Sequence, residues 1–188
     1  MKKVLFLMAF IFAINLNAQT NWKLDPVHAK MTFTVTHMTI SEVDGVFRDF
    51  DAAITASKED FSDAVFEVTA ELTTVTTNNE KRDADLQSEG MFDTAKHPKL
   101  TFKSTGIEKL EGNKFKLTGD LTIKGVTKTV SLDLTLLGMR ENPRSKKMRA
   151  GFKVGGIIDR TDFGVGKMPA MMVGNDVELR ASGEFVKQ

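Results

Sequence analysis

The stretch from Leu117 to Leu136 restricts the fold of this chain more than any other segment. Apolar and polar residues alternate from Leu117 to Ile123, and the alternation resumes from Val130 to Leu136 after a short turn that contains Gly125. A period of two puts the apolar side chains of both runs on one face of a β-hairpin, whereas a helix would expose half of them. The pattern therefore predicts two antiparallel strands with one apolar and one polar face.

The same alternation recurs along the rest of the chain. Residues 22–26 are expected to form a short extended lead-in segment, because Pro26 disfavours helix at Asp25. Further strands are predicted over 30–40, 43–56, 65–76, from 100 onward, 114–124, 129–139, 148–160 and 177–185. The polar stretch 77–90 starts with capping residues and ends on Gly90, which is typical of a short surface helix, with Leu86 as its apolar anchor.

These elements indicate an all-β fold of eight main strands, mostly antiparallel, with one short cap helix. Strands of ten or more residues are long against the usual five or six and span roughly 35 Å at about 3.3 Å per residue. A sheet of this length with one apolar face must roll up, so we predict an elongated barrel. No repeat or linker marks a second domain, and residues 19–188 are therefore predicted to form a single domain.

Residues 1–18 have the composition of a secretory signal peptide. Lys2 and Lys3 precede an uncharged apolar run, which is shorter than the roughly 20 residues that a membrane-spanning helix needs. Cleavage is expected after Ala18 and leaves 24 basic and 25 acidic residues, a formal charge of −1. This balance disfavours nucleic acid as a partner, and the absence of cysteine excludes disulfides and cysteine metal sites.

Small residues occupy many of the predicted inward positions. They are Ala70, Ser104, Gly119, Ala150, Ala181 and Gly183. Such residues are expected to leave unfilled length in the barrel, and an empty apolar tunnel costs about 24 cal/mol per Å³. We therefore favour a tunnel that holds a slender ligand, with a core packed solid by long side chains as the alternative.

Six segments in this order resemble the YceI-like family of exported bacterial proteins. They read LDPVHAKMTFTVTHM, VDGVFRDF, TNNEKRDADLQSEGMFDTAKHPKLTFKST, LTGDLTIKGVTK, IDRTDFG and VGNDVEL. The resemblance implies a lipocalin-like, eight-stranded barrel in the periplasm that binds long isoprenoid or other amphiphilic lipid chains and has no established catalysis. Ala29, Thr36 and Asp85 stand where the family often has Ser, a basic residue and His, so the resemblance implies chain binding rather than a particular head group.

Apolar inward positions and one glycine- and methionine-rich loop supply the candidate lining residues. They are Phe33, Val35, His37, Phe47, Leu72, Phe102, Leu117, Leu121, Phe152, Met168 and Met171. The loop over 163–176 is predicted to act as a mobile edge of the tunnel, because glycine permits hinge movement and methionine adapts to varied chains. Its alternative role is an ordinary plug of the barrel end.

His37 shares the apolar face with its strand neighbours, so its imidazole is expected to need a partner. That partner is either a ligand oxygen or a nearby protein group, and both remain open. His28 and His97 are expected to be structural, while Arg82 and Asp83 are expected to brace the cap helix. No known catalytic motif accompanies these residues, and neither a metal nor a cofactor is predicted.

The sequence thus predicts a non-enzymatic carrier for a long-chain lipid or isoprenoid, quinone-like molecules included. One alternative is a lipid-modifying enzyme that uses His37 with Asp83 or Asp162, and the other is a structural stress-response protein with a filled barrel. Transient membrane contact and a homodimer are left open.

Overall fold

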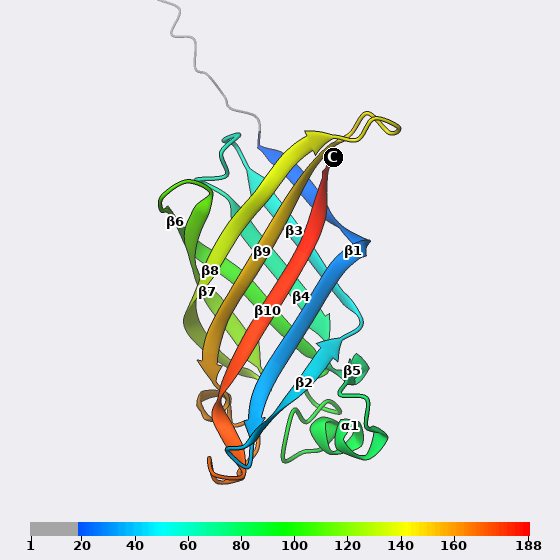
Figure 1. Ribbon diagram of the computed structural model, residues 1–188, viewed down its shortest axis with the longest axis vertical. Coiled ribbons are helices and arrows are strands. Elements are labelled where there is room, and N and C mark those ends of the chain that lie inside the picture. Colours follow the sequence, from blue (N-terminus) through cyan, green and yellow to red (C-terminus); the bar gives the residue numbers. More distant parts are fainter. Residues whose placement is uncertain (1–18) are drawn as a thin grey trace, which may run out of the picture.

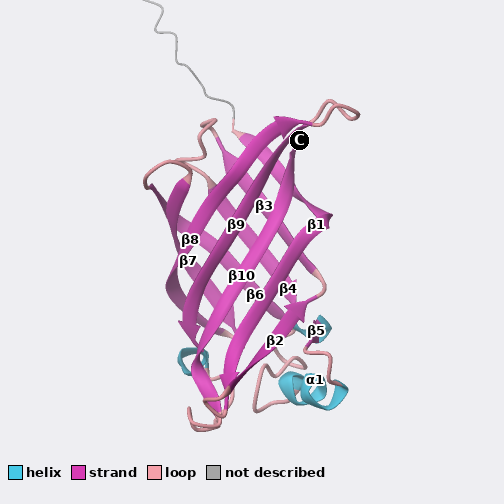
Figure 2. Cartoon of the chain, in the orientation of Figure 1, coloured by secondary structure: helices cyan, strands magenta, loops and turns pink. Residues whose placement is uncertain are grey.

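The computed structural model describes residues 19–188, and the predicted signal peptide (1–18) lies outside them. In chain order the elements are β1 (Thr20–His37), β2 (Ser41–Phe47), β3 (Phe50–Ala56), β4 (Val65–Glu71), a 3₁₀ turn η1 (Leu72–Thr74), β5 (Val75–Thr76), α1 (Glu80–Gln87), β6 (Lys99–Lys109), β7 (Lys114–Ile123), β8 (Val126–Glu141), β9 (Met148–Asp159), a 3₁₀ turn η2 (Arg160–Phe163) and β10 (Val173–Lys187). Figure 2 shows that strands dominate.

The strands form one antiparallel sheet that closes on itself as an elongated barrel (Figure 1). Around the wall the order is β1, β3, β4, β6, β7, β8, β9 and β10, and the ring closes where β10 pairs with β1. The predicted eight-stranded antiparallel barrel with one helix is therefore confirmed. Among residues 19–188, no helix is long and apolar enough to cross a membrane.

The hairpin that anchors the sequence pattern is β7 and β8. Ile123 pairs with Val126 across the two-residue turn Lys124–Gly125, and both turn residues have positive φ, at 52° and 74°. Such a turn matches the right-handed twist of the flanking strands. The His97 ring lies under this turn, because a Cβ added to Gly125 would be 2.7 Å from His97 Cε1. His97 is thus a packing residue, as expected.

β1 is one long strand rather than a lead-in segment followed by a separate strand. It pairs with β10 over most of its length, and the register shifts between Asp25 and Ala29, around Pro26. Proline cannot donate a ladder hydrogen bond, so a bulge accommodates it without ending the strand. The strand stops at His37, before the predicted residue 40, because Met38 and Thr39 turn with positive φ.

Two predicted strands are each divided in the structure. The predicted strand 43–56 is β2 and β3, which separate at Arg48 and Asp49, and the predicted strand 65–76 leaves the sheet after Glu71. The two breaks lie side by side, since the Glu71 N–H donates to Asp49 O and the Asp49 N–H donates to Thr74 Oγ1. As a result β2 and β5 pair with each other beside α1 at one end of the barrel.

The predicted cap helix is present as α1. Asn79 caps its start by accepting the Arg82 N–H at 3.0 Å. The predicted stop at Gly90 is wrong, because the Ser88 N–H already donates to Asp85 O and ends the helix. A serine in extended conformation therefore replaces the expected glycine signal.

The two ends of the barrel differ inside. We call the end near the C-terminus, at the top of Figure 1, the plugged end, and the end with α1 and the β1–β2 turn the hollow end. At the plugged end the Phe152 ring meets the rings of Phe61, Phe66 and Phe185 edge-on, at centroid distances of 5.0, 5.3 and 5.8 Å. Trp22 adds a further contact to Phe61 at 5.3 Å.

Large neighbours fill the space beside several inward glycines. A Cβ on Gly119 would lie 2.5 Å from Phe102 Cζ, and a Cβ on Gly183 would lie 2.7 Å from Leu24 Cδ1. Gly45 likewise lies against the ring of Phe33, its pairing partner on β1. The expectation that small inward residues leave empty length is therefore wrong at Gly119, whereas Ala181 and Gly183 do border internal space.

Candidate binding cavity

The barrel encloses two adjoining cavities, whose walls share Leu100 and Leu179. The upper cavity, toward the plugged end, has a volume of about 100 Å³, and the lower cavity, at the hollow end, about 520 Å³. Pockets for small ligands usually measure roughly 300–1,000 Å³. The lower cavity is in that range, and the upper one adds a smaller space next to it.

The upper cavity is lined almost entirely by apolar side chains. Four predicted lining residues, Phe102, Leu117, Leu121 and Phe152, lie in its wall. Leu24, Met31, Phe50, Phe66, Leu132, Leu134 and Phe185 lie there too. Arg180 and Ser182 are the polar residues of its lining, and the apolar side chains around them suit a hydrocarbon chain.

The lower cavity combines apolar walls with a polar side. The predicted residues Phe33, Val35, Phe47 and Met168 line it, together with His37 at the end of β1. Its polar wall consists of Thr77, Arg82, Asp85, Ser88 and Arg160. A few polar groups in a mostly apolar pocket are the usual means of orienting a ligand.

Two predicted lining residues lie elsewhere. Leu72 is fully buried in the core at η1, outside the walls of both cavities. Met171 is 71% exposed, because the chain turns back at Pro169, whose carbonyl accepts the N–H groups of Met172 and Val173. Both positions follow from turns that the residue pattern did not reveal.

The His37 side chain is exposed, so the expectation of a buried imidazole is wrong. The residue ends β1, where the chain turns outward. Within the described residues, no hydrogen bond joins the imidazole to Asp83 or Asp162, and both Asp83 oxygens accept from Thr76 and Thr77. The geometry therefore gives no acid–base pair for the enzymatic alternative.

Asp83 and Arg82 together hold the segment before α1. The Asp83 carboxylate accepts from the Thr77 N–H at 2.7 Å and its Oγ1 at 2.6 Å, and Arg82 donates to Thr77 Oγ1 and O. Burial opposes ionisation of Asp83, but the Thr77 and Thr76 hydrogen bonds outweigh it and lower the pKa of the carboxyl. The two residues brace the helix, as expected, while Arg82 also borders the lower cavity.

Arg160 is the main residue that sequence reasoning missed. Its side chain is buried, at 4% exposure, and lines the lower cavity. Its five N–H groups meet five backbone carbonyls, those of Val165, Gly166, Met168, Val173 and Gly174, at 2.8–3.1 Å. Asn175 Oδ1 lies at 3.4 Å. One guanidinium therefore ties the whole loop between η2 and β10 to the barrel.

A sequence signal for Arg160 existed. The alternation of β9 places Ala150, Phe152 and Ile158 inward, and the next position in that register is Arg160. The neighbouring acids suggest an ion pair, yet Asp159 instead accepts from the N–H and Oγ1 of Thr161, hydrogen bonds that lower the pKa of Asp159. A buried arginine without a carboxylate needs several dipoles, and a glycine-rich loop supplies them.

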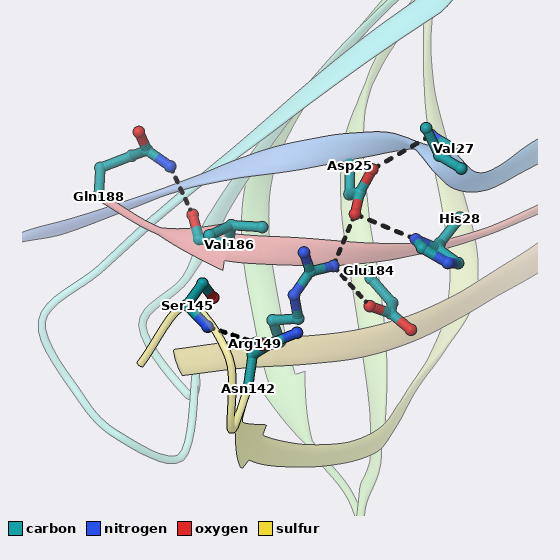
Figure 3. Close-up of polar contacts among 9 residues, drawn as sticks. All are labelled: Asp25, Val27, His28, Asn142, Ser145, Arg149, Glu184, Val186 and Gln188. Atoms are coloured by element: carbon teal, nitrogen blue, oxygen red, sulfur yellow. Dashed lines mark hydrogen bonds and ion pairs between the residues drawn. The ribbon is translucent and has the colours of Figure 1, made fainter. Parts of the chain in front are cut away.

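A second charged cluster lies at the seam where β10 closes on β1 (Figure 3). The Arg149 guanidinium lies between Asp25 and Glu184, at 2.6 and 2.8 Å, and His28 Nδ1 is 3.0 Å from Asp25. Arg149 chiefly, and then His28, lower the pKa of Asp25 to about 2. The donor atoms of Asp25, His28 and Glu184 are close enough for a metal ion, but Arg149 already supplies the positive charge there.

Comparisons with known proteins agree with the motifs. The YceI-like domain model matches residues 22–185. Over 193 residues, covering 100% of both chains, the chain is 36% identical to Protein YceI of Escherichia coli O157:H7. A Campylobacter jejuni YCEI protein shares 32% identity and a TM-score of 0.74, over 81% of this chain and 90% of that one.

A more distant solved structure shares the fold alone. It is a polyisoprenoid binding domain from Saccharophagus degradans implicated in plant cell wall breakdown, with 13% identity, a TM-score of 0.68 and coverage of 89% of this chain and 98% of that one. The matched domain model and the full-length identity to Protein YceI show that the chain belongs to the YceI-like family.

Proposed function

We propose that this protein binds one long-chain isoprenoid or similar amphiphilic lipid, with its polar end at the polar side of the lower cavity and its chain running along the apolar walls of the lower cavity toward the upper one. The observation that carries the proposal is the pair of adjoining cavities, apolar at the plugged end and partly polar at the hollow end. The distant neighbour described as a polyisoprenoid binding domain supports the same ligand class.

Hydrocarbon burial supplies enough affinity for such a ligand. Each buried methylene is worth about 0.8 kcal/mol, so ten of them offer about 8 kcal/mol before the cost of ordering the chain. The apolar walls of the two cavities need no elaborate polar site for this. A filled-barrel structural protein is less well supported, because the lower cavity alone measures about 520 Å³.

We further propose that the protein carries its lipid in the periplasm. The support is the composition of residues 1–18, with two lysines before an uncharged apolar run. N-terminal sequencing of protein purified from a periplasmic fraction tests this point. A mature N-terminus at Gln19 is expected, and an intact N-terminus in the cytoplasmic fraction would contradict it.

Mass spectrometry of organic extracts tests lipid binding directly. Protein purified without detergent is expected to release a long-chain lipid at about one molecule per barrel. Lipid-free protein that also fails to bind an added fluorescent polyprenol would reject the proposal.

A matched pair of variants locates the site. Val177 lines the lower cavity, so Val177→Trp is expected to reduce polyprenol binding at least tenfold by filling the space. Asp176→Trp puts the same ring on the exposed neighbouring position and should bind like the unchanged protein. Equal binding by both variants would show that the ligand does not bind in the lower cavity.

A further inference from the structure

The hollow end carries an exposed apolar surface that the proposed lipid cavity does not use. Met38 and Ile40, in the β1–β2 turn, are 53% and 84% exposed, and Met171 and Met172, in the loop before β10, are 71% and 52% exposed. We call these four residues the apolar tips. The Met38 N–H donates to Met172 O at 2.9 Å, so the two turns form one connected surface.

Charge sets this surface apart from the other end of the barrel. Residues 36–41 (THMTIS) and 168–175 (MPAMMVGN) contain no Asp, Glu, Lys or Arg. The connections at the plugged end, 57–63 (SKEDFSD) and 142–147 (NPRSKK), are rich in charge. Single exposed apolar residues are ordinary, but four on two adjoining uncharged turns are the mark of an interaction site.

The apolar tips continue directly into the lower cavity. Met168 and Val173, which flank Met171 and Met172, line that cavity, and so does His37, which precedes Met38. Figure 1 shows the two turns together at the lowest point of the barrel, with α1 beside them. A lipid that leaves a surface touching the apolar tips would therefore reach the cavity without crossing much water.

We propose that the apolar tips are a docking surface for a lipid bilayer, through which the protein takes up and returns its lipid. The inference rests on the proposed lipid-binding function. Four side chains are far fewer than the 20 to 30 residues per side of a usual protein interface, which disfavours a second copy of the chain. Apolar tips on turns without charged residues instead suit insertion into the boundary between head groups and acyl chains.

Vesicle flotation tests the docking surface. The probes are vesicles of phosphatidylcholine alone and of phosphatidylcholine with phosphatidylglycerol. The variant Met38→Ser, Ile40→Ser, Met171→Ser, Met172→Ser is expected to bind both at least tenfold more weakly than the unchanged protein. The control Leu110→Ser, Leu137→Ser, Met139→Ser removes apolar residues that are 44%, 60% and 44% exposed elsewhere, and it should bind like the unchanged protein.

Uptake of a fluorescent polyprenol separates the two proposals. Delivered as a dilute monomer, it should bind all three proteins equally, whereas its extraction from vesicles should slow at least tenfold only in the tip variant. Vesicle binding that is equal in all three proteins would overturn the docking surface, as would tip-dependent self-association in sedimentation without vesicle binding. Failure of monomer uptake in every protein would instead reject the proposed function.

Discussion

The plugged and hollow ends of this barrel are built from the same alternating strands, yet different interactions hold them together. At the plugged end the rings of Phe61, Phe66, Phe152 and Phe185 fill the interior. At the hollow end the interior stays open, and backbone segments held by Arg160, Arg82 and Asp83 surround it.

The difference shows how a barrel can be stable and still admit a ligand. Packed rings lose their contacts when they separate, so the plugged end is expected to be rigid. Hydrogen bonds at a surface loop can be exchanged for bonds to water, so the hollow end is expected to open locally without unfolding the wall. Leu100 and Leu179, which line both cavities, lie between the rigid end and the end that opens.

The largest effect is expected from removing a ring at the plugged end. Phe61 is 1% exposed and contacts Trp22 and Phe152, so Phe61→Ala should lower the free energy of unfolding by about 3–5 kcal/mol. Phe33→Ala at the hollow end should cost clearly less, because the Phe33 ring borders a cavity. Chemical denaturation measures the free energy of unfolding of both variants. Equal decreases would show that the two ends do not differ in packing.

The next effect concerns the loop at the hollow end. Arg160→Lys keeps the charge but has three N–H donors instead of five, so it should cost roughly 2 kcal/mol. The loss should be local, with faster amide hydrogen exchange over residues 163–175 and little change in β7 and β8. Arg180→Lys, at an exposed position on β10, is the control. Uniformly faster exchange across the barrel would show that the loop is not a separate unit.

A smaller effect on stability is expected where the upper cavity meets the plugged end, together with a change in the chain length of the bound lipid. Phe152 lines the upper cavity and packs against Phe61, which lies outside it, so Phe152→Leu should cost about 1.5 kcal/mol and let longer chains enter. The mean chain length of co-purified lipid, measured by mass spectrometry, is expected to rise. Phe115→Leu, at a buried position outside that cavity, is the matched control. An unchanged chain length in Phe152→Leu would mean that the plugged end does not limit the ligand.

The smallest effect is expected at the seam between β1 and β10. The Arg149 and His28 contacts depress the pKa of Asp25 from 3.8 to about 2, so the ionised carboxylate stabilises the fold above pH 3.8. That contribution is lost as the pH falls toward 2. Asp25→Asn should therefore lower the free energy of unfolding at pH 7 by less than about 1 kcal/mol, and Tm with it. The difference from the unchanged protein should shrink between pH 4 and pH 2, and a constant difference would refute the assignment.

Much of the fold could be predicted from the sequence. The alternation around Gly125 defined the β7–β8 hairpin, and repeated alternation predicted eight strands and their inward faces. Inward register also placed Phe102, Leu117 and Leu121 in the cavity wall. These predictions succeed because a strand exposes alternate residues to opposite faces, a local property that the sequence records directly.

Other features depended on residues that meet only in the folded chain. The sequence marked Gly119 and Gly183 as small and inward, but only the barrel brings Phe102 and Leu24 over them. Likewise only the turn at Pro169 directs Met171 outward.

The sequence by itself determined that the chain forms a long antiparallel barrel and which side chains point inward. Tertiary structure decided where that interior is filled and where it is hollow, and it gave Arg160 its five carbonyl partners. The physical reason is that strand alternation fixes the direction of a side chain. The space in front of that side chain is set by strands and loops distant in the sequence, whose approach only the closed barrel defines.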